Sequence, residues 1–151
     1  MMTKQSNILV IGGTGKTGRK VATGLNQHNQ KVRIGSRGNS PGFDWHDPAT
    51  WPDALAGMDK VYITYYPDLA VPGALEAIEG LTDAAKRAGV QKAVLLSGKG
   101  EQEAERCEQV VAGSGLDYTL VRASWFNQNF SESFLLEPIL AGYVALPMPD
   151  A

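Results

Sequence analysis

The sequence has little of what disulfide-bonded, secreted or membrane proteins need. Cys107 is the single cysteine, which excludes an intrachain disulfide and a cysteine-rich metal site. No apolar run approaches the roughly 18 residues of a membrane span, and the first residues, MMTKQSN, have neither the basic start nor the apolar core of a signal peptide. From these absences we expect a protein of the reducing cytoplasm.

No charge of one sign dominates the chain either. The 151 residues carry 14 basic and 16 acidic side chains, which gives a formal net charge of −2. We therefore expect neither a nucleic acid nor a membrane surface as a partner. The chain also lacks internal repeats, low-complexity segments and linkers, so its length suits one domain over residues 1–151.

What the sequence does contain is a regular alternation of short apolar runs and longer helical patterns. We expect strands at residues 8–11, 31–35, 60–64, 92–97 and 117–122, and helices at 16–27, 50–56, 72–88 and 101–112. Gly89 reads as the stop of the third helix. Strands that alternate with helices predict a parallel sheet with right-handed crossovers.

Residues 42–47, GFDWHD, are the weakest element of this pattern. They are too short to assign from periodicity, but they stand where a third strand would fit. With that strand the sheet would have the Rossmann order 3-2-1-4-5-6. The expected fold is therefore α/β, a three-layer Rossmann fold around a doubly wound parallel sheet.

A glycine-rich stretch, ILVIGGTGKTGRKV at residues 8–21, joins the first strand to the first helix. Its Gly-Lys-Thr resembles the end of an ATP-binding P-loop, but the glycine that such a loop requires five positions earlier is replaced by Val10. Two dinucleotide templates, G-x-G-x-x-G and G-x-x-G-x-x-G, are instead satisfied by Gly12, Gly13, Gly15 and Gly18. The stretch therefore favours a dinucleotide over ATP, with a tight turn that holds no ligand as the alternative.

A second stretch, at residues 95–132, reads LLSGKGEQEAERCEQVVAGSGLDYTLVRASWFNQNFSE. Together with GGTGKTGRKV it resembles the NmrA-like branch of the atypical short-chain dehydrogenase/reductase superfamily. The resemblance covers nearly the whole chain, and its most specific part surrounds Arg122, Trp125, Phe126, Asn127 and Asn129. It implies NAD(P) binding on a Rossmann fold, with some members that reduce quinones or other small substrates and others that only sense nucleotide redox state.

Chains of this family usually continue well beyond the point where this one stops, and the later part completes the substrate pocket. The resemblance therefore implies that this chain lacks the family's C-terminal part, either as a fragment or as a natural short form.

The residues after the second predicted strand bear on the choice of cofactor. NAD-preferring Rossmann sites have an acidic residue about 20 positions past the glycines, where it binds the ribose 2′-hydroxyl. Ser36 and Arg37 stand at that place. A guanidinium can bond a 2′-phosphate bidentately and a serine hydroxyl can donate to it. The sequence thus predicts NADP(H) in preference to NAD(H), with a solvated loop charge as the alternative role for Arg37.

The remaining cofactor contacts follow from the loop or from the resemblance. The pyrophosphate is expected at the backbone N–H groups of residues 14–17, where a helix start favours anions. The resemblance implies that Asp44 and Trp45 flank the adenine. Residues 64–66 should lie beside the nicotinamide ribose, although the tyrosines there could simply pack against a loop. The expected cofactor-binding residues are Gly12, Thr14, Gly15, Lys16, Thr17, Gly18, Ser36, Arg37, Asp44, Trp45, Thr64, Tyr65, Tyr66 and Ser97.

Catalytic residues are harder to identify, because the Tyr-x-x-x-Lys pair of the broader superfamily is missing. In that pair the lysine lowers the pKa of the tyrosine, which then passes a proton while hydride moves. Tyr118 has Arg122 at the required spacing, but both fall on the last predicted strand. Ser97 and Lys99 could polarise a carbonyl, yet a turn-capping role for Ser97 is the favoured interpretation. The catalytic residues therefore stay unknown, and no metal site is expected.

Two functions fit these observations. The first is an NADPH-dependent reductase that passes hydride directly to a quinone or another small acceptor, whose reduced oxygens can take protons from water. The second is a non-catalytic NAD(P) redox sensor that acts through a protein partner. A remnant without nucleotide affinity is the least favoured, because the glycine loop is intact. Expected partners are the dinucleotide, a small-molecule acceptor, and a protein partner or a second copy in a homodimer.

Overall fold

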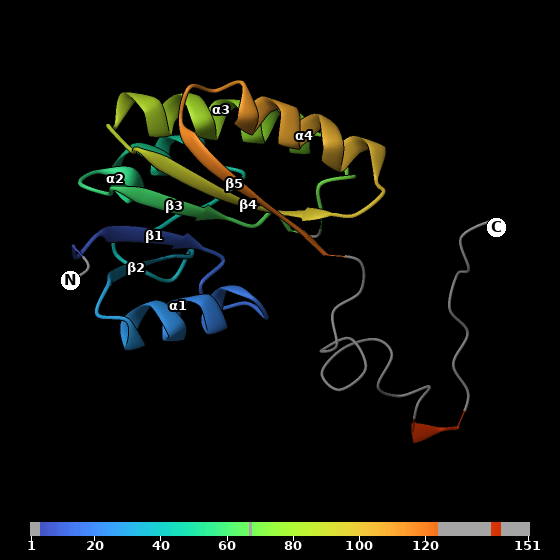
Figure 1. The fold of residues 1–151 in the computed structure, drawn as a ribbon, viewed down its shortest axis with the longest axis horizontal. Helices are drawn as coiled ribbons and strands as arrows, with labels where there is room; N and C mark the ends of the chain where they lie inside the picture. Colours follow the sequence, from blue (N-terminus) through green and yellow to red (C-terminus); the bar gives the residue numbers. More distant parts are fainter. Residues whose placement is uncertain (1–3, 67, 124–139, 143–151) are drawn as a thin grey trace.

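The computed structural model describes residues 4–66, 68–123 and 140–142. These residues form a parallel sheet with helices on both faces (Figure 1). The strands are β1 (Asn7–Ile11), β2 (Lys31–Gly35), β3 (Lys60–Ile63), β4 (Lys92–Gly98) and β5 (Asp117–Ala123). The helices are α1 (Gly18–Gln27), α2 (Trp51–Leu55), α3 (Ala74–Arg87) and α4 (Gln102–Ala112), and a 3-10 turn, η1 (Pro48–Thr50), precedes α2.

The sheet has the order β2-β1-β3-β4-β5, and every neighbouring pair is parallel. β1 lies between β2 and β3, so that Val10 pairs with Ile34 on one side and with Tyr62 on the other. The chain therefore reverses its winding direction beside β1, and in such sheets ligands bind in the crevice outside the carboxyl ends of the strands. The predicted doubly wound α/β fold is confirmed.

Two apolar layers hold the sheet between its helices. α1 covers one face, while α2, α3 and α4 lie on the other (Figure 1). The larger core lies beneath α2, α3 and α4 and includes Leu9, Ile63, Ile78, Leu95 and Cys107, all at most 1% exposed. The smaller cluster faces α1 and consists of Ile8, Val10, Ala22 and Tyr62. Alternate residues of β1 thus enter different layers, as expected for a strand buried on both faces.

The helices begin and end close to the predicted residues. α1 begins at Gly18 rather than at residue 16, because residues 12–17 form the turn that leads into it. α3 ends at Arg87, and Gly89 adopts a positive φ of 82°, as a helix stop requires. Among the described residues, no helix has both the length and the apolar character needed to cross a membrane.

The strand predicted at residues 42–47 is wrong. The backbone N–H of Phe43 donates to Ser36 O at 2.9 Å, and that of Asp44 donates to Thr50 Oγ1 at 3.0 Å, so neither is available for pairing with β2. Phe43 also stacks on Trp51 with ring centroids 6.2 Å apart. Local turns and aromatic packing therefore hold this segment as a loop. The remaining strands keep the predicted relative order, with β2 at the edge of the sheet.

Candidate functional site

A cleft of about 440 Å³ opens at the carboxyl ends of β1, β2 and β3. It is lined by the loop after β1, by the end of β2 with the loop that follows, and by the residues after β3. Segments far apart in the sequence therefore meet at the switch point of the sheet. The predicted cofactor-binding residues that line the cleft are Gly12, Thr14, Gly15, Ser36, Arg37, Asp44, Trp45, Thr64 and Tyr66.

The turn between β1 and α1 requires glycine at two positions. Gly12 has a φ of 71°, and a Cβ placed on it would lie 2.5 Å from Thr64 Oγ1. A Cβ on Gly18 would collide with the carbonyl group of Gly12. The N–H of Gly15 donates to Gly12 O at 2.9 Å, which closes the turn. These close approaches allow the backbone to curl tightly at the start of α1.

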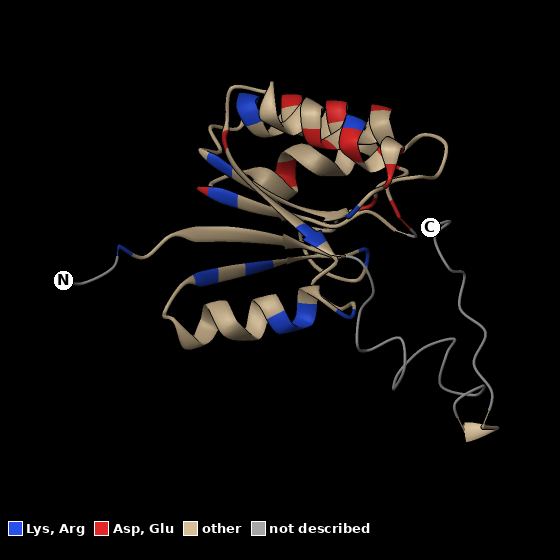
Figure 2. Ribbon diagram, turned by 45° about the vertical axis from the view of Figure 1, so that its right-hand side comes forward, with Lys and Arg blue, Asp and Glu red and all other residues tan. Residues whose placement is uncertain are grey.

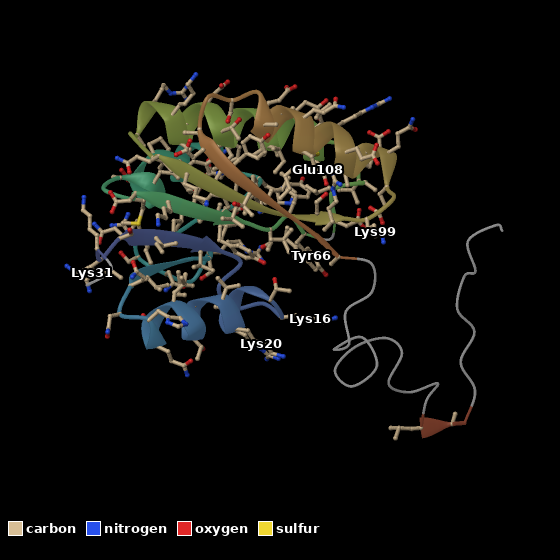
Figure 3. The ribbon with its side chains drawn as sticks, viewed as in Figure 1. Lys16, Lys20, Lys31, Tyr66, Lys99 and Glu108 are labelled. Carbon is tan, nitrogen blue, oxygen red and sulfur yellow. The ribbon has the colours of Figure 1, made fainter. Side chains whose placement is uncertain are left out.

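The start of α1 carries the residues at which the pyrophosphate is expected. Lys16, Thr17 and Gly18 lie there, outside the lining of the cleft, and Lys16 lies at the same end of the sheet as Tyr66 (Figure 3). Thr17 precedes the helix but makes no side-chain capping hydrogen bond to it. The helix dipole favours negative charge at such a start, although the N–H of Arg19 is already engaged, donating to Gly15 O at 3.1 Å.

The loop after β2 is held over the cleft by aromatic side chains. Trp45 donates its Nε1–H to Thr64 O at 3.1 Å, which ties the loop to the end of β3. Trp51 donates to Asp44 O at 2.9 Å from the first turn of α2. Phe43 packs edge-on against Trp45 with ring centroids 5.1 Å apart. The loop is therefore fixed by buried contacts even though it pairs with no strand.

The loop after β2 brings one positive and one negative side chain to the cleft, Arg37 and Asp44. Arg37 is exposed, and its guanidinium has no hydrogen-bond or ion-pair partner within the part of the chain that the structure describes. Ser36 Oγ forms a hydrogen bond with Asn39 Oδ1. The Asp44 carboxylate accepts from the N–H of His46 at 2.9 Å. A free guanidinium thus stands at the end of β2, while the nearby carboxylate is engaged by its own turn.

The three residues after β3 differ in their surroundings. Thr64 Oγ1 donates to Ile11 O at 3.0 Å and so joins the ends of β3 and β1. Tyr66 is 86% exposed and lines the cleft. Tyr65 does not line it and packs edge-on against Trp45 with ring centroids 5.0 Å apart. Tyr65 therefore packs against the loop after β2, the alternative to a place beside the nicotinamide ribose.

Ser97 and Lys99 lie outside the cleft lining. Ser97 is 4% exposed, and within the described residues its Oγ makes no hydrogen bond of full geometry, although it lies near enough to the Glu108 carboxylate to help lower the pKa of that group. The turn-capping bond expected of Ser97 is therefore not observed among these residues. Because Ala93 and Leu95 of β4 are buried in the larger core, Ser97 faces the same layer. Lys99 is exposed in the turn after β4 and lies at the same end of the sheet as Tyr66 (Figure 3). The structure does not bring Ser97 and Lys99 together with the glycine loop.

A buried carboxylate links α4 to β5. Glu108 is 4% exposed, and both of its oxygens accept from Arg122, at 2.9 Å from Nε and 2.9 Å from Nη2. These hydrogen bonds hold the pKa of Glu108 below its ordinary value, against the effect of burial. A cavity of about 350 Å³ lies beside the pair, lined by α4 and β5 rather than by the glycine loop. Arg122, four residues after Tyr118, therefore serves a salt bridge in this structure.

Some residues near the site were missed by the sequence analysis. Phe43 and His46 line the cleft, and they flank the predicted Asp44 and Trp45. Tyr62 donates its hydroxyl to Thr17 Oγ1 at 3.2 Å, beneath the start of α1. The alternation of β3 could have placed Tyr62 on the face opposite Val61 and Ile63, but nothing in the sequence indicates its hydrogen bond.

Comparisons with known proteins agree with this geometry. A family model described as NAD(P)H-binding matches residues 12–136. The chain is 34% identical to prestalk A differentiation protein A of Dictyostelium discoideum, covering 98% of this chain and 54% of that protein. It is 32% identical to an NAD(P)H azoreductase of Xenophilus azovorans, covering 81% of this chain and 49% of that protein. The chain thus spans about half the length of these curated relatives.

Solved structures show the same fold. A triphenylmethane reductase of Citrobacter sp. complexed with NADP(H) is 19% identical, with a TM-score of 0.60 over 82% of this chain and 51% of that chain. An NADPH-dependent quinone oxidoreductase of Escherichia coli is 22% identical, with a TM-score of 0.61 over 89% of this chain and 51% of that chain. The chain therefore belongs to the NAD(P)H-binding family, as the resemblance to an NAD(P)-binding Rossmann family predicts.

Proposed function

We propose that the chain is the cofactor-binding part of an NADPH-dependent reductase that passes hydride directly to a small acceptor. The observation that carries the proposal is the single cleft that joins the glycine loop after β1 to the guanidinium after β2. A loop of backbone N–H groups suits a pyrophosphate, and an unpaired guanidinium suits a phosphomonoester. NADP(H) carries both groups.

The cofactor would lie across the carboxyl ends of the strands. Its pyrophosphate would rest on the turn of residues 12–18, and Asp44 and Trp45 would flank its adenine. The nicotinamide ribose would lie toward Thr64 and Tyr66, on the β3 side of the cleft. The lining of the cleft supports this orientation, because the loop after β2 and the residues after β3 flank the glycine loop.

The preference for NADP(H) is assigned to Arg37, with help from Ser36. Exchanging Arg37→Asp should lower NADPH affinity about tenfold or more, because a charge-assisted hydrogen bond is lost and a repulsive carboxylate is gained. NADH affinity should stay the same or rise. Arg87→Asp, on the exposed side of α3, makes the same charge change away from the cleft and should alter neither affinity. An NADPH-to-NADH affinity ratio that Arg37→Asp leaves unchanged would refute the assignment.

The proposed reaction needs no tyrosine acid. When bound, NADPH would supply the hydride, with its electron pair, that reduces the acceptor and would itself be oxidised to NADP⁺, while the reduced acceptor would take its proton from water. The names of two proteins similar to this chain, an azoreductase and a quinone oxidoreductase, point to acceptors that undergo two-electron reduction. Because the chain spans half the length of such proteins, the acceptor site is proposed for the whole protein.

A redox sensor is the second candidate, and the position of Ser97 favours it. Ser97, one of the two weak catalytic candidates, is buried, and neither it nor Lys99 belongs to the lining of the cleft. Steady NADPH oxidation by the full-length protein with a panel of quinones, above free-flavin and buffer controls, would support the reductase. Tight NADPH binding without turnover would support the sensor and refute the reductase.

A further inference from the structure

Tyr62 is a polar group in an apolar layer. It lies in the middle of β3 on the face that α1 covers, among Ile8, Val10 and Ala22, and is 8% exposed. Its hydroxyl donates to Thr17 Oγ1 at 3.2 Å. Burial raises the pKa of the Tyr62 hydroxyl above its ordinary value, although the bond to Thr17 opposes this, so the group is a neutral donor at physiological pH.

The hydrogen bond joins the sheet to the residue before α1. A hydroxyl without a partner is costly in an apolar layer, and here the two hydroxyls satisfy one another. The rest of this interface is apolar packing, including the half-buried Val21 and Leu25 of α1. Apolar contacts tolerate small shifts, whereas a hydrogen bond sets a distance and a direction. The pair therefore determines where the first turn of α1 sits over β3.

The Thr17 hydroxyl contacts the sheet rather than capping α1, and the helical φ of −89° and ψ of −41° of this residue are unlike those of a capping residue. A threonine before a helix commonly accepts from the N–H groups of the first turn and so occupies them. Thr17 makes no such bond, and its oxygen is engaged by Tyr62 instead. The N–H of Arg19 in that first turn donates to Gly15 O at 3.1 Å, so the backbone of the turn satisfies it without the Thr17 side chain.

We propose that Tyr62 is a positioning residue for the phosphate-binding turn: through Thr17 it fixes the backbone of residues 14–17, where the cofactor pyrophosphate is expected, over the end of the sheet. The inference rests on the proposed function, because it needs the pyrophosphate to lie at this turn. Tyr62 itself touches no part of the cofactor. Its effect should therefore be confined to ligands that carry a pyrophosphate.

The experiment compares two ligands in wild type and Tyr62→Phe. ADP-ribose 2′-phosphate has the pyrophosphate, whereas adenosine 2′-monophosphate reaches only the adenine and Arg37 side of the cleft. Tyr62→Phe should weaken binding of the first about threefold to tenfold, the scale of one hydrogen bond, and leave the second unchanged. Tyr118→Phe, at an exposed position on β5, should change neither.

Two exchanges of Thr17 provide an independent test that does not alter the core tyrosine. Thr17→Ser keeps the hydroxyl and should bind ADP-ribose 2′-phosphate as wild type does. Thr17→Val keeps the shape and should lose as much affinity as Tyr62→Phe, with no further loss when the two are combined.

The possible results separate this inference from the proposed function. Equal losses for both ligands, or none for either, would overturn the positioning role while dinucleotide binding stands. If Tyr62→Phe does not fold, Thr17→Val with the affinity of Thr17→Ser would overturn it. A folded wild type that binds neither ligand would overturn the proposed function and the positioning role with it.

Discussion

Gly18 and Gly24 lie in the same helix but differ in what a side chain would meet. A Cβ on Gly18 would collide with the Gly12 carbonyl, whereas one on Gly24 has nothing within 4 Å. Gly18→Ala should therefore push α1 away from the turn. Dinucleotide affinity should fall about tenfold or more, because the backbone N–H groups of the turn would no longer point at the pyrophosphate. Gly24→Ala should stabilise the protein by about 0.5–1 kcal/mol, because alanine favours a helix.

Thermal unfolding and cofactor titration of both variants check this contrast. Unchanged affinity in Gly18→Ala would contradict the account of the turn. A loss of affinity in Gly24→Ala would mean that α1 as a whole, rather than its contact with Gly12, is the sensitive feature.

Cys107 illustrates a residue whose burial decides its chemistry. It is 0% exposed, and burial, with smaller contributions from Glu103, Glu76 and Glu79, raises the pKa of its thiol to about 11. Because the pKa is raised in the folded state, the buried neutral thiol makes its full contribution to stability below about pH 9. This contribution is lost as the pH rises toward 11. We expect iodoacetamide to leave the native protein unlabelled at pH 8 and to label it in guanidinium chloride. Rapid labelling of the native protein would contradict the burial.

At the scale of elements, the Glu108–Arg122 pair joins α4 to the edge strand β5. The Glu108 side chain is 5% exposed and the Arg122 side chain 58%, so only the guanidinium is well solvated by water. Arg122→Met leaves a buried carboxylate unpaired, whereas Glu108→Gln leaves an exposed cation that water can solvate. Arg122→Met should therefore lower the melting temperature more than Glu108→Gln does at pH 7.

The lowered pKa of Glu108 gives this contact a pH dependence. Its contribution to stability is present above about pH 4.5, the ordinary value, and is lost as the pH falls through the lower folded value. The difference in melting temperature between wild type and Glu108→Gln should therefore narrow below pH 4.5. A difference that stays constant down to pH 3 would show that the ionised carboxylate does not stabilise the fold.

The elements also show which patterns the sequence could reveal. β1 and β2 were predictable because continuous or β-branched apolar runs between glycine-rich turns identify buried strands. Residues 42–47 were not, because Phe43 and Trp45 alternate as in a strand while their backbone bonds to Ser36 and Thr50. Such competition between local turns and strand pairing is decided by tertiary packing, here with Trp51 and Tyr65.

Part of the candidate site could also be predicted from the sequence, and part of it could not. The glycine loop and Arg37 stand at fixed distances along the chain from the strands that carry them, so their meeting in one cleft follows from the fold. The burial of Ser97 could not be deduced from the sequence, because both alternating sets of β4 begin with apolar residues, Ala93 and Leu95 on one face and Val94 and Leu96 on the other. The Tyr62–Thr17 bond joins residues 45 positions apart, and no local pattern reports such a contact.

At the scale of the whole molecule, the small net charge conceals a separation of charge. The first 43 residues contain no aspartate or glutamate, and their basic residues are Lys4, Lys16, Arg19, Lys20, Lys31, Arg33 and Arg37. These residues span β1, α1 and β2, whereas acidic side chains gather on α3 and α4 (Figure 2). The half of the molecule that carries the glycine loop is thus positive, which should attract an anionic dinucleotide from solution.

This separation predicts a salt dependence that differs between cofactors. NADPH, with its additional phosphate, should lose about threefold to tenfold in association rate between about 20 mM and 500 mM salt, and NADH less. Lys20→Gln, beside the turn, should lower the NADPH rate at low salt, whereas Lys86→Gln on α3 should not. Stopped-flow quenching of tryptophan fluorescence measures these rates, because Trp45 lines the cleft. Equal salt dependence for the two cofactors would contradict the prediction.

The central claim is that the glycine loop and Arg37 together form a site for NADP(H). Calorimetric titration of the purified 151-residue chain with NADPH, NADP⁺, NADH and ATP tests it most directly. We predict saturable binding of NADPH and NADP⁺, weaker binding of NADH and none of ATP. ATP binding that matches NADPH binding, or a folded chain that binds no dinucleotide, would contradict the claim.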